Sequence, residues 1–554
     1  MTRINLYCPN CGHTEEYTTP RLACANCGDT YLDAAYELDK PLNWPDALYD
    51  RPDTMWRFRE LLPLRDDHNI ISMGEGMTPL IKSDNLGAML GLKNLYIKDE
   101  RQGPTASFKD RQASLAISQM REHGIKEAVV ASTGNVAIAY AAYAARALIK
   151  MWAFTISSIP ADKVREISLY GAEVVKVTGT YDQAKQISQK FAESKGLFLD
   201  RGIKSIAAKE AMKTISFEIA WQLGEKIGPT SKDLPWRSPD WYIQAVSGGL
   251  GPIGVMKGFR ELEQFNLSQG LPKLGMIQSV GCDPMVRAFH ANQEEAAPFM
   301  QPSTRIATVA TDVPGIAYKV LRSDILNSGG TFESVSDEEA FAALRRVAQL
   351  EGLSVEPATA LAFAGLFKMV HDRQIKPDEV VVVNCSGHTF PVEKHILGDS
   401  LATHDLDVTA LTQQTMPHEG LLAALETSDS RVRRVVVIED DPGASRLMTR
   451  ILQSHGVPDV QAAMDGEAGI NLVMDVHPDL IVLDLMMPGI DGFQVLDRLK
   501  SHEILKDVPV VVVTAKDLTN EERTVLSGRV ASLLQKGAAV DPDVLKSLID
   551  EKLK

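Results

Sequence analysis

Two blocks of alternating strand and helix patterns, separated by a stretch without periodicity, constrain the fold of this 554-residue chain most strongly. In the first block, apolar β-rich runs are separated by helical stretches rich in Ala, Leu and Lys. The runs are Glu127–Ala131, Ala172–Val177, Trp241–Val246, Leu274–Val280 and Glu379–Asn384. This alternation predicts an α/β domain with a mainly parallel sheet covered by helices on both faces.

The second block follows an aperiodic stretch rich in Thr, Gln, Asp and Ser. We interpret residues 401–432 as a linker with one short helix at 420–426. Three buried-strand runs then follow, at Val435–Ile438, Leu480–Leu483 and Val508–Val513. They predict a separate, smaller α/β domain over residues 433–554 with a parallel sheet.

Composition excludes several classes of function. Hydrophobic residues make up 44% and charged residues 24%, so each domain can bury a core. The formal charge of −15 argues against a nucleic-acid partner, which requires clustered Lys and Arg. No apolar run reaches the roughly 18 residues of a membrane span, and residues 1–7 contain no signal-peptide core. We therefore expect a cytoplasmic protein without a membrane partner.

Four of the six cysteines form two C-x-x-C pairs near the N-terminus, Cys8 with Cys11 and Cys24 with Cys27. A glycine follows each pair and allows the backbone turn that directs both thiolates at one ion. The spacing predicts a structural zinc ribbon over residues 1–35. Disulfides are the alternative, which a cytosolic location disfavours. The two other cysteines, Cys282 and Cys385, lie in apolar surroundings and are expected to be buried thiols.

Lys109 is the first candidate catalytic residue. It follows the turn-forming run Pro104–Ser107 and precedes a helical sequence, Gln112–Arg121, so it is expected at the start of a helix. The positive end of a helix dipole disfavours an ammonium group and favours the neutral amine, which attacks carbonyls. A solvated surface lysine is the alternative when this residue is considered alone.

Two further segments lie between a predicted strand and a predicted helix. The first is the glycine loop Ser247, Gly248, Gly249, Leu250 and Gly251, whose backbone N–H groups can converge on a phosphate. The second contains Ser132, Thr133, Gly134 and Asn135. Its small polar side chains can bind a carboxylate or a cofactor hydroxyl, although a simple helix N-cap is the better explanation when this segment is considered alone.

Together with Gly74–Leu80 and Ser386–His388, these motifs resemble threonine synthase and its relatives among the fold-type II pyridoxal-phosphate enzymes. The N-terminal ribbon also resembles one found in several threonine synthase-like proteins. The resemblance implies a tryptophan synthase β-like fold with two α/β subdomains over residues 36–400. It also implies the cofactor pyridoxal 5'-phosphate, an amino-acid substrate and a homodimer.

The resemblance also implies roles for individual residues. Lys109 would bind the cofactor as a Schiff base and move the substrate α-proton, and Asn135 would bind the cofactor's ring hydroxyl. The glycine loop would bind the cofactor phosphate, while Ser132 and Thr133 would bind the substrate carboxylate. Ser386 would contact the pyridine nitrogen. A neutral hydroxyl there makes the ring a weaker electron sink, which suits elimination and replacement better than transamination.

The chain departs from the threonine synthase pattern where that family binds the substrate phosphate. Val136 follows Asn135 in place of Thr or another small residue, and Ala208 stands where the family has an arginine. Lys204 or Lys209 are candidates to compensate. The lost arginine leaves several substrates open, because a bidentate phosphate partner is not replaced by alanine. They are O-phosphohomoserine, O-phosphoserine in a β-replacement, and threonine or serine in a deamination.

Acidic residues follow two predicted strands of the C-terminal domain. Glu439 and Asp440 come after the first strand and Asp484 after the second, so these carboxylates should meet at one edge of the sheet. Magnesium prefers such oxygen ligands. A solvated acidic face is the alternative.

With Thr514, Lys536 and Met487–Gly492, this segment resembles the flavodoxin-like receiver domain of two-component response regulators. The resemblance implies Asp484 as phosphoacceptor, Thr514 and Lys536 as sensing residues, and a histidine kinase or phosphotransfer protein as partner. The sequence thus predicts a lyase of threonine synthase type with a regulatory receiver. The alternative is a signalling protein whose cofactor domain senses an amino acid with little turnover.

Overall fold

The structure is a computed structural model of the chain. It describes residues 3–18, 21, 23–132, 134–157, 159–388, 403–407, 434–454, 457, 459–502, 505–506, 508–514, 526, 529–530 and 532–535. These residues form two compact units, one ending at Asp407 and the other beginning at Arg434. No helix in these ranges combines the length and hydropathy that a membrane span needs.

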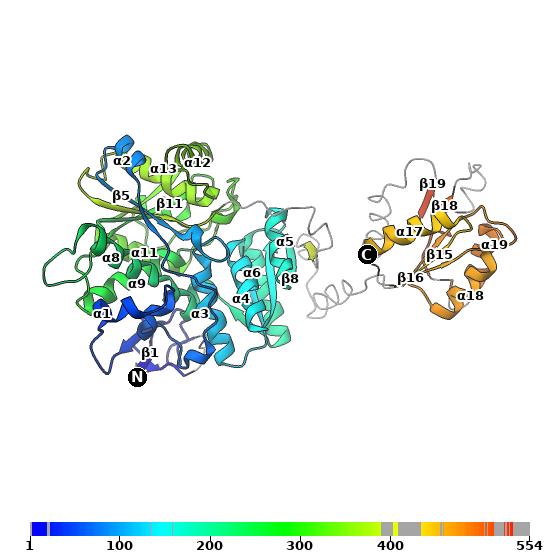
Figure 1. The fold of residues 1–554 in the computed structure, drawn as a ribbon, viewed down its shortest axis with the longest axis horizontal. Helices are drawn as coiled ribbons and strands as arrows, with labels where there is room; N and C mark the ends of the chain where they lie inside the picture. Colours follow the sequence, from blue (N-terminus) through cyan, green and yellow to red (C-terminus); the bar gives the residue numbers. More distant parts are fainter. Residues whose placement is uncertain are drawn as a thin grey trace. The chain divides into compact units, whose positions relative to one another are not determined.

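A three-stranded antiparallel sheet at the N-terminus opens the first unit (Figure 1). Its strands, in the order β2-β1-β3, are β1 (Arg3–Tyr7), β2 (Thr14–Glu16) and β3 (Asp33–Glu37). Alternate residues of β1, Ile4 and Leu6, are buried, as the period of two in a strand requires for a sheet with one covered face.

The larger sheet of the first unit has six strands in the order β12-β11-β10-β13-β5-β4, all parallel except the edge strand β4. The strands are β4 (Leu80–Lys82), β5 (Asn94–Asp99), β10 (Trp241–Ala245), β11 (Lys273–Ser279), β12 (Thr331–Val335) and β13 (Val380–Cys385). Successive residues enter different cores: Tyr242 packs in the cluster that includes α8 (Thr214–Ile227) and α9 (Leu250–Gln264). Ile243 packs in the cluster that includes α12 (Asp337–Glu351) and α13 (Pro357–His371), so helices cover both faces.

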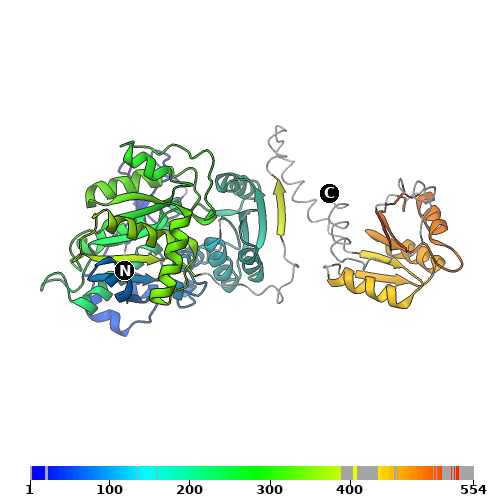
Figure 2. The ribbon, with the colours of Figure 1, turned by 90° about the horizontal axis from the view of Figure 1, so that it is seen from above.

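The second sheet of this unit has five parallel strands in the order β14-β8-β7-β6-β9, and Figure 2 shows it beside the larger one. The strands are β6 (Glu127–Ala131), β7 (Lys150–Ile156), β8 (Glu173–Thr178), β9 (Phe198–Asp200) and β14 (Thr403–Asp407). Its helices are α3 (Lys109–Glu122), α4 (Asn135–Ala147), α5 (Ala161–Leu169) and α6 (Tyr181–Lys195). We refer to the two sheets with their helices as the large and small subdomains.

Shorter elements complete the first unit. The remaining described α-helices are α1 (Trp44–Ala47), α2 (Asp84–Leu90), α7 (Ile206–Met212), α10 (Pro284–His290) and α11 (Ile316–Ser328). The 3-10 helices are Leu48–Asp50, Met55–Leu61, Asp67–Asn69, Glu100–Gln102, Gly202–Lys204 and Ala307–Val309.

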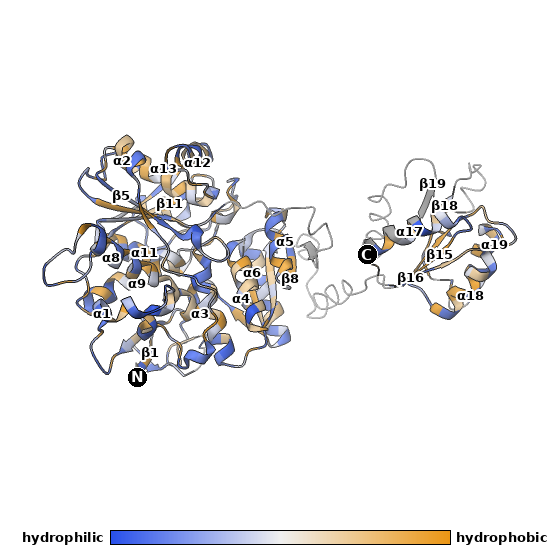
Figure 3. Ribbon diagram, viewed as in Figure 1, coloured by the Kyte–Doolittle hydropathy of each residue, from blue (hydrophilic) through white to orange (hydrophobic). Residues whose placement is uncertain are grey.

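The second unit is a five-stranded parallel sheet in the order β16-β15-β17-β18-β19. Its elements are β15 (Arg434–Ile438), α17 (Pro442–Ser454), β16 (Asp459–Ala463), α18 (Gly466–Val476), β17 (Leu480–Leu483), α19 (Gly492–Ser501), β18 (Val510–Thr514) and β19 (Ser532–Gln535). Figure 3 shows the apolar character of the central strands. Val435 and Val436 enter separate cores on opposite faces, so this is a doubly wound sheet whose strand order reverses beside β15.

The predicted elements agree with the structure in type, and β6 and β17 agree residue for residue. One difference concerns the predicted linker. Residues Thr403–Asp407 form β14, which pairs in parallel with β8 and extends the small sheet. Backbone pairing therefore decides the state of a segment whose side chains show no periodicity. The predicted helix at 420–426 lies outside the described residues, and the domain boundaries stay predictions.

Candidate active site and metal centres

The loop that precedes Lys109 is held from two sides. On one side, the Phe108 amide donates to the carbonyl oxygen of Ser386 at 3.0 Å, and the His388 amide donates to Ala106 at 3.0 Å. On the other side, the Asp110 carboxylate accepts from the amide of Thr105 at 3.0 Å and from its hydroxyl at 2.6 Å. Burial raises the pKa of Asp110 to about 7. The loop is thereby fixed against the segment after β13.

Lys109 is the first residue of α3, as the sequence predicts. Burial lowers the pKa of Lys109 to about 8, and the negative charge of Glu356 partly opposes this shift. Its Nζ atom lies 4.0 Å from the centroid of the Phe108 ring. A larger fraction of this amine is therefore neutral near pH 7 than for a solvated lysine, which favours nucleophilic attack.

Lys109 lines a cavity of about 420 Å³ between the carboxyl ends of strands from both sheets. The described residues to which the resemblance assigns cofactor or substrate binding all line it: Lys109, Ser132, Asn135, Ser247, Gly248, Gly249, Leu250, Gly251 and Ser386. Thr133 lies outside the described residues. The structure thus brings together four motifs that are far apart in the sequence.

The glycine loop connects β10 to α9, and neighbouring side chains lie close to its backbone at two of its glycines. Gly249 has φ of 75°, and a Cβ atom there would lie 2.9 Å from Leu321 Cδ1. A Cβ atom on Gly251 would lie 2.7 Å from Gln244 Nε2. A Cβ atom on Gly248, in contrast, would have no heavy atom within 4 Å. Because the first N–H groups of α9 have no partner within the helix, the loop offers donors to an anion in this space.

Asn135 is the first residue of α4, and its side chain is held by two charged groups. Its amide nitrogen donates to both carboxylate oxygens of Glu356, at 3.0 and 2.9 Å. Its oxygen accepts from Lys163 Nζ at 2.6 Å. Sequence reasoning missed Glu356 and Lys163. Glu356 directly precedes Pro357 at the start of α13, so its pattern is that of a helix cap, although only 5% of the residue is exposed.

Ser386 and Ser132 both have hydrogen-bond partners within the protein. The hydroxyl groups of Ser386 and Thr359 lie 2.8 Å apart, and the Ser386 hydroxyl donates to Glu356 at 3.4 Å. The Ser132 hydroxyl oxygen accepts from the amides of Gly134 and Ala137, each at 3.1 Å. Ser132 therefore caps α4, while its hydroxyl proton is still able to reach a ligand in the cavity.

The two lysines that could replace the missing arginine differ in position. Lys209 donates to the carbonyl oxygen of Leu32, and its Nζ atom lies 3.9 Å from the ring centroid of Tyr31. It therefore faces the N-terminal sheet. Lys204 lines the cavity, as do two cations that the sequence did not single out, Lys185 and Arg201.

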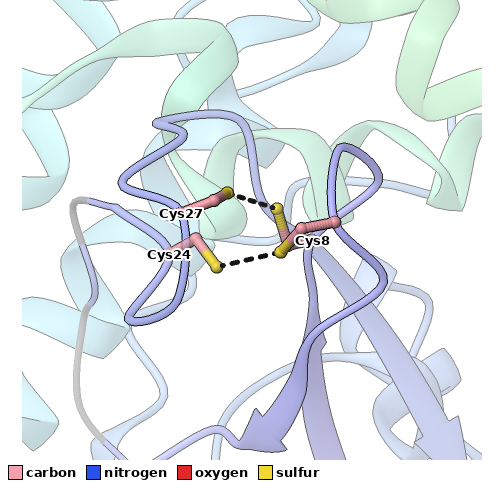
Figure 4. Close-up of side chains that lie close together, drawn as sticks. Cys8, Cys24 and Cys27 are labelled. Atoms are coloured by element: carbon pink, nitrogen blue, oxygen red, sulfur yellow. Dashed lines mark hydrogen bonds between the residues drawn. The ribbon is translucent and has the colours of Figure 1, made fainter.

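The four N-terminal cysteines lie close together, and Figure 4 shows Cys8, Cys24 and Cys27 of this group. The sulfur atoms of Cys8 and Cys27 lie 3.6 Å apart, and those of Cys11 and Cys24 lie 3.7 Å apart. All four are free thiols, and their sulfur atoms lie within 4.8 Å of one another. Four thiolates around a tetrahedral zinc ion with Zn–S bonds of about 2.3 Å are roughly 3.8 Å apart. The geometry fits a metal better than disulfides.

Cys282 and Cys385 are buried, as expected. Burial raises the pKa of Cys282 to about 11, which keeps it a thiol near neutral pH.

In the second unit, Glu439, Asp440 and Asp484 each place one carboxylate oxygen within 4.8 Å of the others. Asp484 follows β17, and its side chain accepts from the Met486 amide at 3.1 Å. Thr514 ends β18 and is 1% exposed. Lys536 lies outside the described residues. Three buried or half-buried carboxylates at this separation repel one another, and a divalent cation relieves that repulsion.

Comparison with known proteins identifies both units. Residues 71–387 match the pyridoxal-phosphate dependent enzyme family, and residues 435–550 match the response regulator receiver domain. The threonine synthase of Methanocaldococcus jannaschii is 34% identical over 382 residues, which cover 69% of this chain and 91% of that relative. The threonine synthase of Methanosarcina acetivorans is 34% identical over 387 residues, with the same coverage. The chain belongs to the threonine synthase family of pyridoxal-phosphate-dependent enzymes.

This threonine synthase-type enzyme is a lyase with a receiver domain at its C-terminal end. Among solved structures, the processed form of threonine deaminase isoform 2 from Solanum lycopersicum has a TM-score of 0.47 and 22% identity, covering 58% of this chain and 87% of that one.

The residues around the cavity fit the cofactor of the family. The open space beside Gly248 and the helix-start amides suit its phosphate, and the lysine of lowered pKa suits its aldehyde.

Proposed function

We propose that this enzyme converts O-phosphohomoserine and water into threonine and phosphate. The observation that carries the proposal is one cavity that unites Lys109, the glycine loop and three cations, Lys185, Arg201 and Lys204, in a chain that resembles threonine synthases. In the balanced reaction, the bond between Cγ and the phosphate oxygen breaks, Cβ loses a proton and Cγ gains one, the hydroxyl group of water bonds to Cβ, and the remaining proton of water goes to the released phosphate. Pyridoxal phosphate, when bound, withdraws electrons from the substrate Cα and so makes its proton removable.

The protein's own residues would bind and move groups around that centre. Lys109 would hold the cofactor through its amine, and the free amine would transfer the substrate α-proton as a general base and acid. The amides of the glycine loop bind the cofactor phosphate, and Asn135 donates to the ring hydroxyl. Ser386 offers a neutral hydroxyl to the ring nitrogen, while Ser132 and Thr133 bind the substrate carboxylate.

The substrate phosphate requires cations, and the chain lacks the arginine that the family has at the position of Ala208. Arg201 is the strongest replacement, since its Nε atom is buried without a hydrogen-bond partner among the described residues. Lys204 lines the same cavity, and Lys185 approaches it from α6. Arginine matches phosphate in a bidentate arrangement, so Arg201 would dominate this contact.

A second candidate is a lyase or β-replacement enzyme that acts on another amino acid. Val136 and Ala208 favour it, because Val136 replaces Thr or another small residue and Ala208 replaces an arginine of the phosphate-binding pattern. O-phosphoserine and threonine are the substrates to compare. A signalling protein that retains the cofactor domain as a low-turnover amino-acid sensor is the third alternative.

The proposal is tested by offering the three substrates separately to the protein loaded with pyridoxal phosphate. We expect phosphate release with stoichiometric threonine formation from O-phosphohomoserine, and no product from the Lys109→Ala variant. Arg201→Ala should raise KM for O-phosphohomoserine at least tenfold. Turnover of O-phosphoserine or threonine alone supports the second candidate, and cofactor binding without turnover supports the sensor.

We further propose two metals and a regulatory role for the receiver. Cys8, Cys11, Cys24 and Cys27 would bind zinc, and Glu439, Asp440 and Asp484 would bind magnesium. Asp484 would accept phosphate from a histidine kinase or phosphotransfer protein, with Thr514 and Lys536 responding to it. The added charge would change turnover in the cytoplasmic homodimer. Equal turnover of wild type and Asp484→Asn, with and without a small-molecule phosphodonor, contradicts this regulation.

A further inference from the structure

Lys163 and Glu356, which lie outside the motifs described above, form an ion pair, and both contact the side chain of Asn135. Lys163, on α5 of the small subdomain, lies 3.6 Å from Glu356 Oε2. Glu356 directly precedes α13 of the large subdomain, and its backbone amide donates to the carbonyl oxygen of Gly387 at 3.1 Å. The two side chains are 22% and 7% exposed. This pair therefore joins the two subdomains from a largely buried position next to the cofactor cavity.

The chemistry of the two partners fixes how the Asn135 amide is oriented. An ammonium group can only donate, so the amide oxygen must face Lys163; an ionised carboxylate can only accept, so the amide nitrogen must face Glu356. A flipped amide would lose all of these hydrogen bonds. The nitrogen carries two hydrogens, so one of them can be shared by the two Glu356 oxygens while the other donates to an oxygen in the cavity.

Lys163 also limits the space beside Asn135. The Cβ position of Gly134 would lie 3.0 Å from Lys163 Cδ and 3.2 Å from its Nζ atom. Gly134 has φ of 149°, a conformation that suits glycine, and it lets the lysine side chain cross the start of α4. The placement of Lys163 is thus supported by the local backbone.

We propose that Lys163 is a positioning residue of the cofactor site, which orients Asn135 and, paired with Glu356, holds the two subdomains together beside the cofactor's ring oxygen. The inference rests on the proposed cofactor-binding role of Asn135. Lys163 supplies a positive charge near that oxygen and Glu356 a negative one, so the two should affect its ionisation in opposite directions. Besides Glu356, the charged groups that line the cavity are Lys109, Lys185, Asp200, Arg201 and Lys204.

The test uses the full chain without substrate, so it is independent of the reaction. Pyridoxal phosphate is titrated into the apoprotein, and the visible absorption of the bound cofactor is then followed against pH. For Lys163→Met we expect at least tenfold weaker binding and an absorption midpoint raised by about one pH unit, because a nearby cation favours the deprotonated form. Glu356→Gln should lower the midpoint, and Lys163→Arg should stay close to wild type.

Lys150→Met is the matched control, because Lys150 forms an exposed ion pair in the same subdomain, 3.2 Å from Glu127. It should leave both binding and midpoint unchanged. A wild-type midpoint for both Lys163→Met and Glu356→Gln overturns the inference, as does a shift of the same sign for both. If Lys163→Met does not fold, the other two variants still test the inference: Lys163→Arg should keep the wild-type midpoint and Glu356→Gln should lower it. Failure of wild type to bind the cofactor would instead refute the proposed function.

Discussion

Gly248→Ala is predicted to separate cofactor binding from folding. A Cβ atom at this position would have no heavy atom within 4 Å, and Gly248 does not adopt a left-handed conformation. The substitution should therefore change the free energy of unfolding of the apoprotein by no more than about 0.5 kcal/mol. The same methyl group would occupy the space that the cofactor phosphate needs beside the loop amides.

The expected loss of affinity follows from the cost of forcing a methyl group into an occupied site, about 1–3 kcal/mol. That range corresponds to roughly 5- to 150-fold in Kd for pyridoxal phosphate, since about 1.4 kcal/mol is tenfold. Gly249→Ala should behave in the opposite way in the apoprotein. With φ of 75° and Leu321 Cδ1 only 2.9 Å from the new Cβ atom, it should lower the free energy of unfolding by at least about 1 kcal/mol.

The assay combines fluorescence titration of the apoprotein with pyridoxal phosphate and urea unfolding of the same preparations. Weak binding with unchanged unfolding for Gly248→Ala, against reduced stability for Gly249→Ala, is the predicted pattern. Wild-type affinity of Gly248→Ala would refute the assignment of this loop as the phosphate site. A marked decrease in the free energy of unfolding of Gly248→Ala would refute the claim that the space beside this residue is open.

Three further predictions concern the other sites. Cofactor loading of the apoprotein should speed up with pH with a midpoint near pH 8, where half of Lys109 is neutral; a midpoint near pH 10.5 would indicate a solvated lysine. Cys11→Ser should lose the bound zinc measured by atomic absorption, whereas Cys282→Ser should keep it; equal zinc content in both variants would contradict the ribbon. Phosphorylation by acetyl phosphate with magnesium should fail in Asp484→Asn and persist in Asp475→Asn, which mass spectrometry of the intact chain would detect; a phosphorylated Asp484→Asn would assign the phosphoacceptor elsewhere.

Elements with strong apolar runs could be predicted from the sequence. β6 and β17 are such runs between polar residues, so their bounds follow from burial alone. β14 could not be predicted in this way, because its formation depends on pairing with β8, more than 200 residues earlier in the chain. Local patterns carry no information about that partner.

In the candidate site, too, some residues could be predicted from local sequence patterns and others could not. Lys109, Asn135 and the glycine loop stand at strand-to-helix junctions, where α/β folds place ligand sites, so their convergence could be expected. Glu356 and Lys163 stand at positions that look like an ordinary helix cap and a helix surface. Packing of α5 against α4 brings Lys163 to Asn135, and packing of the two subdomains brings Glu356 there. Lys209 is the opposite case. The sequence made it a candidate for binding the substrate phosphate in the cavity, but its side chain donates to Leu32 beside the N-terminal sheet.

The central claim is that Lys109 binds the cofactor, and chemical trapping tests it most directly. The protein is loaded with pyridoxal phosphate at pH 8, reduced with borohydride, digested and analysed by peptide mass spectrometry. The phosphopyridoxyl group should be found on Lys109 at one per chain, and it should be absent from Lys109→Ala. Stoichiometric labelling of another lysine, such as Lys163 or Lys204, would contradict the account.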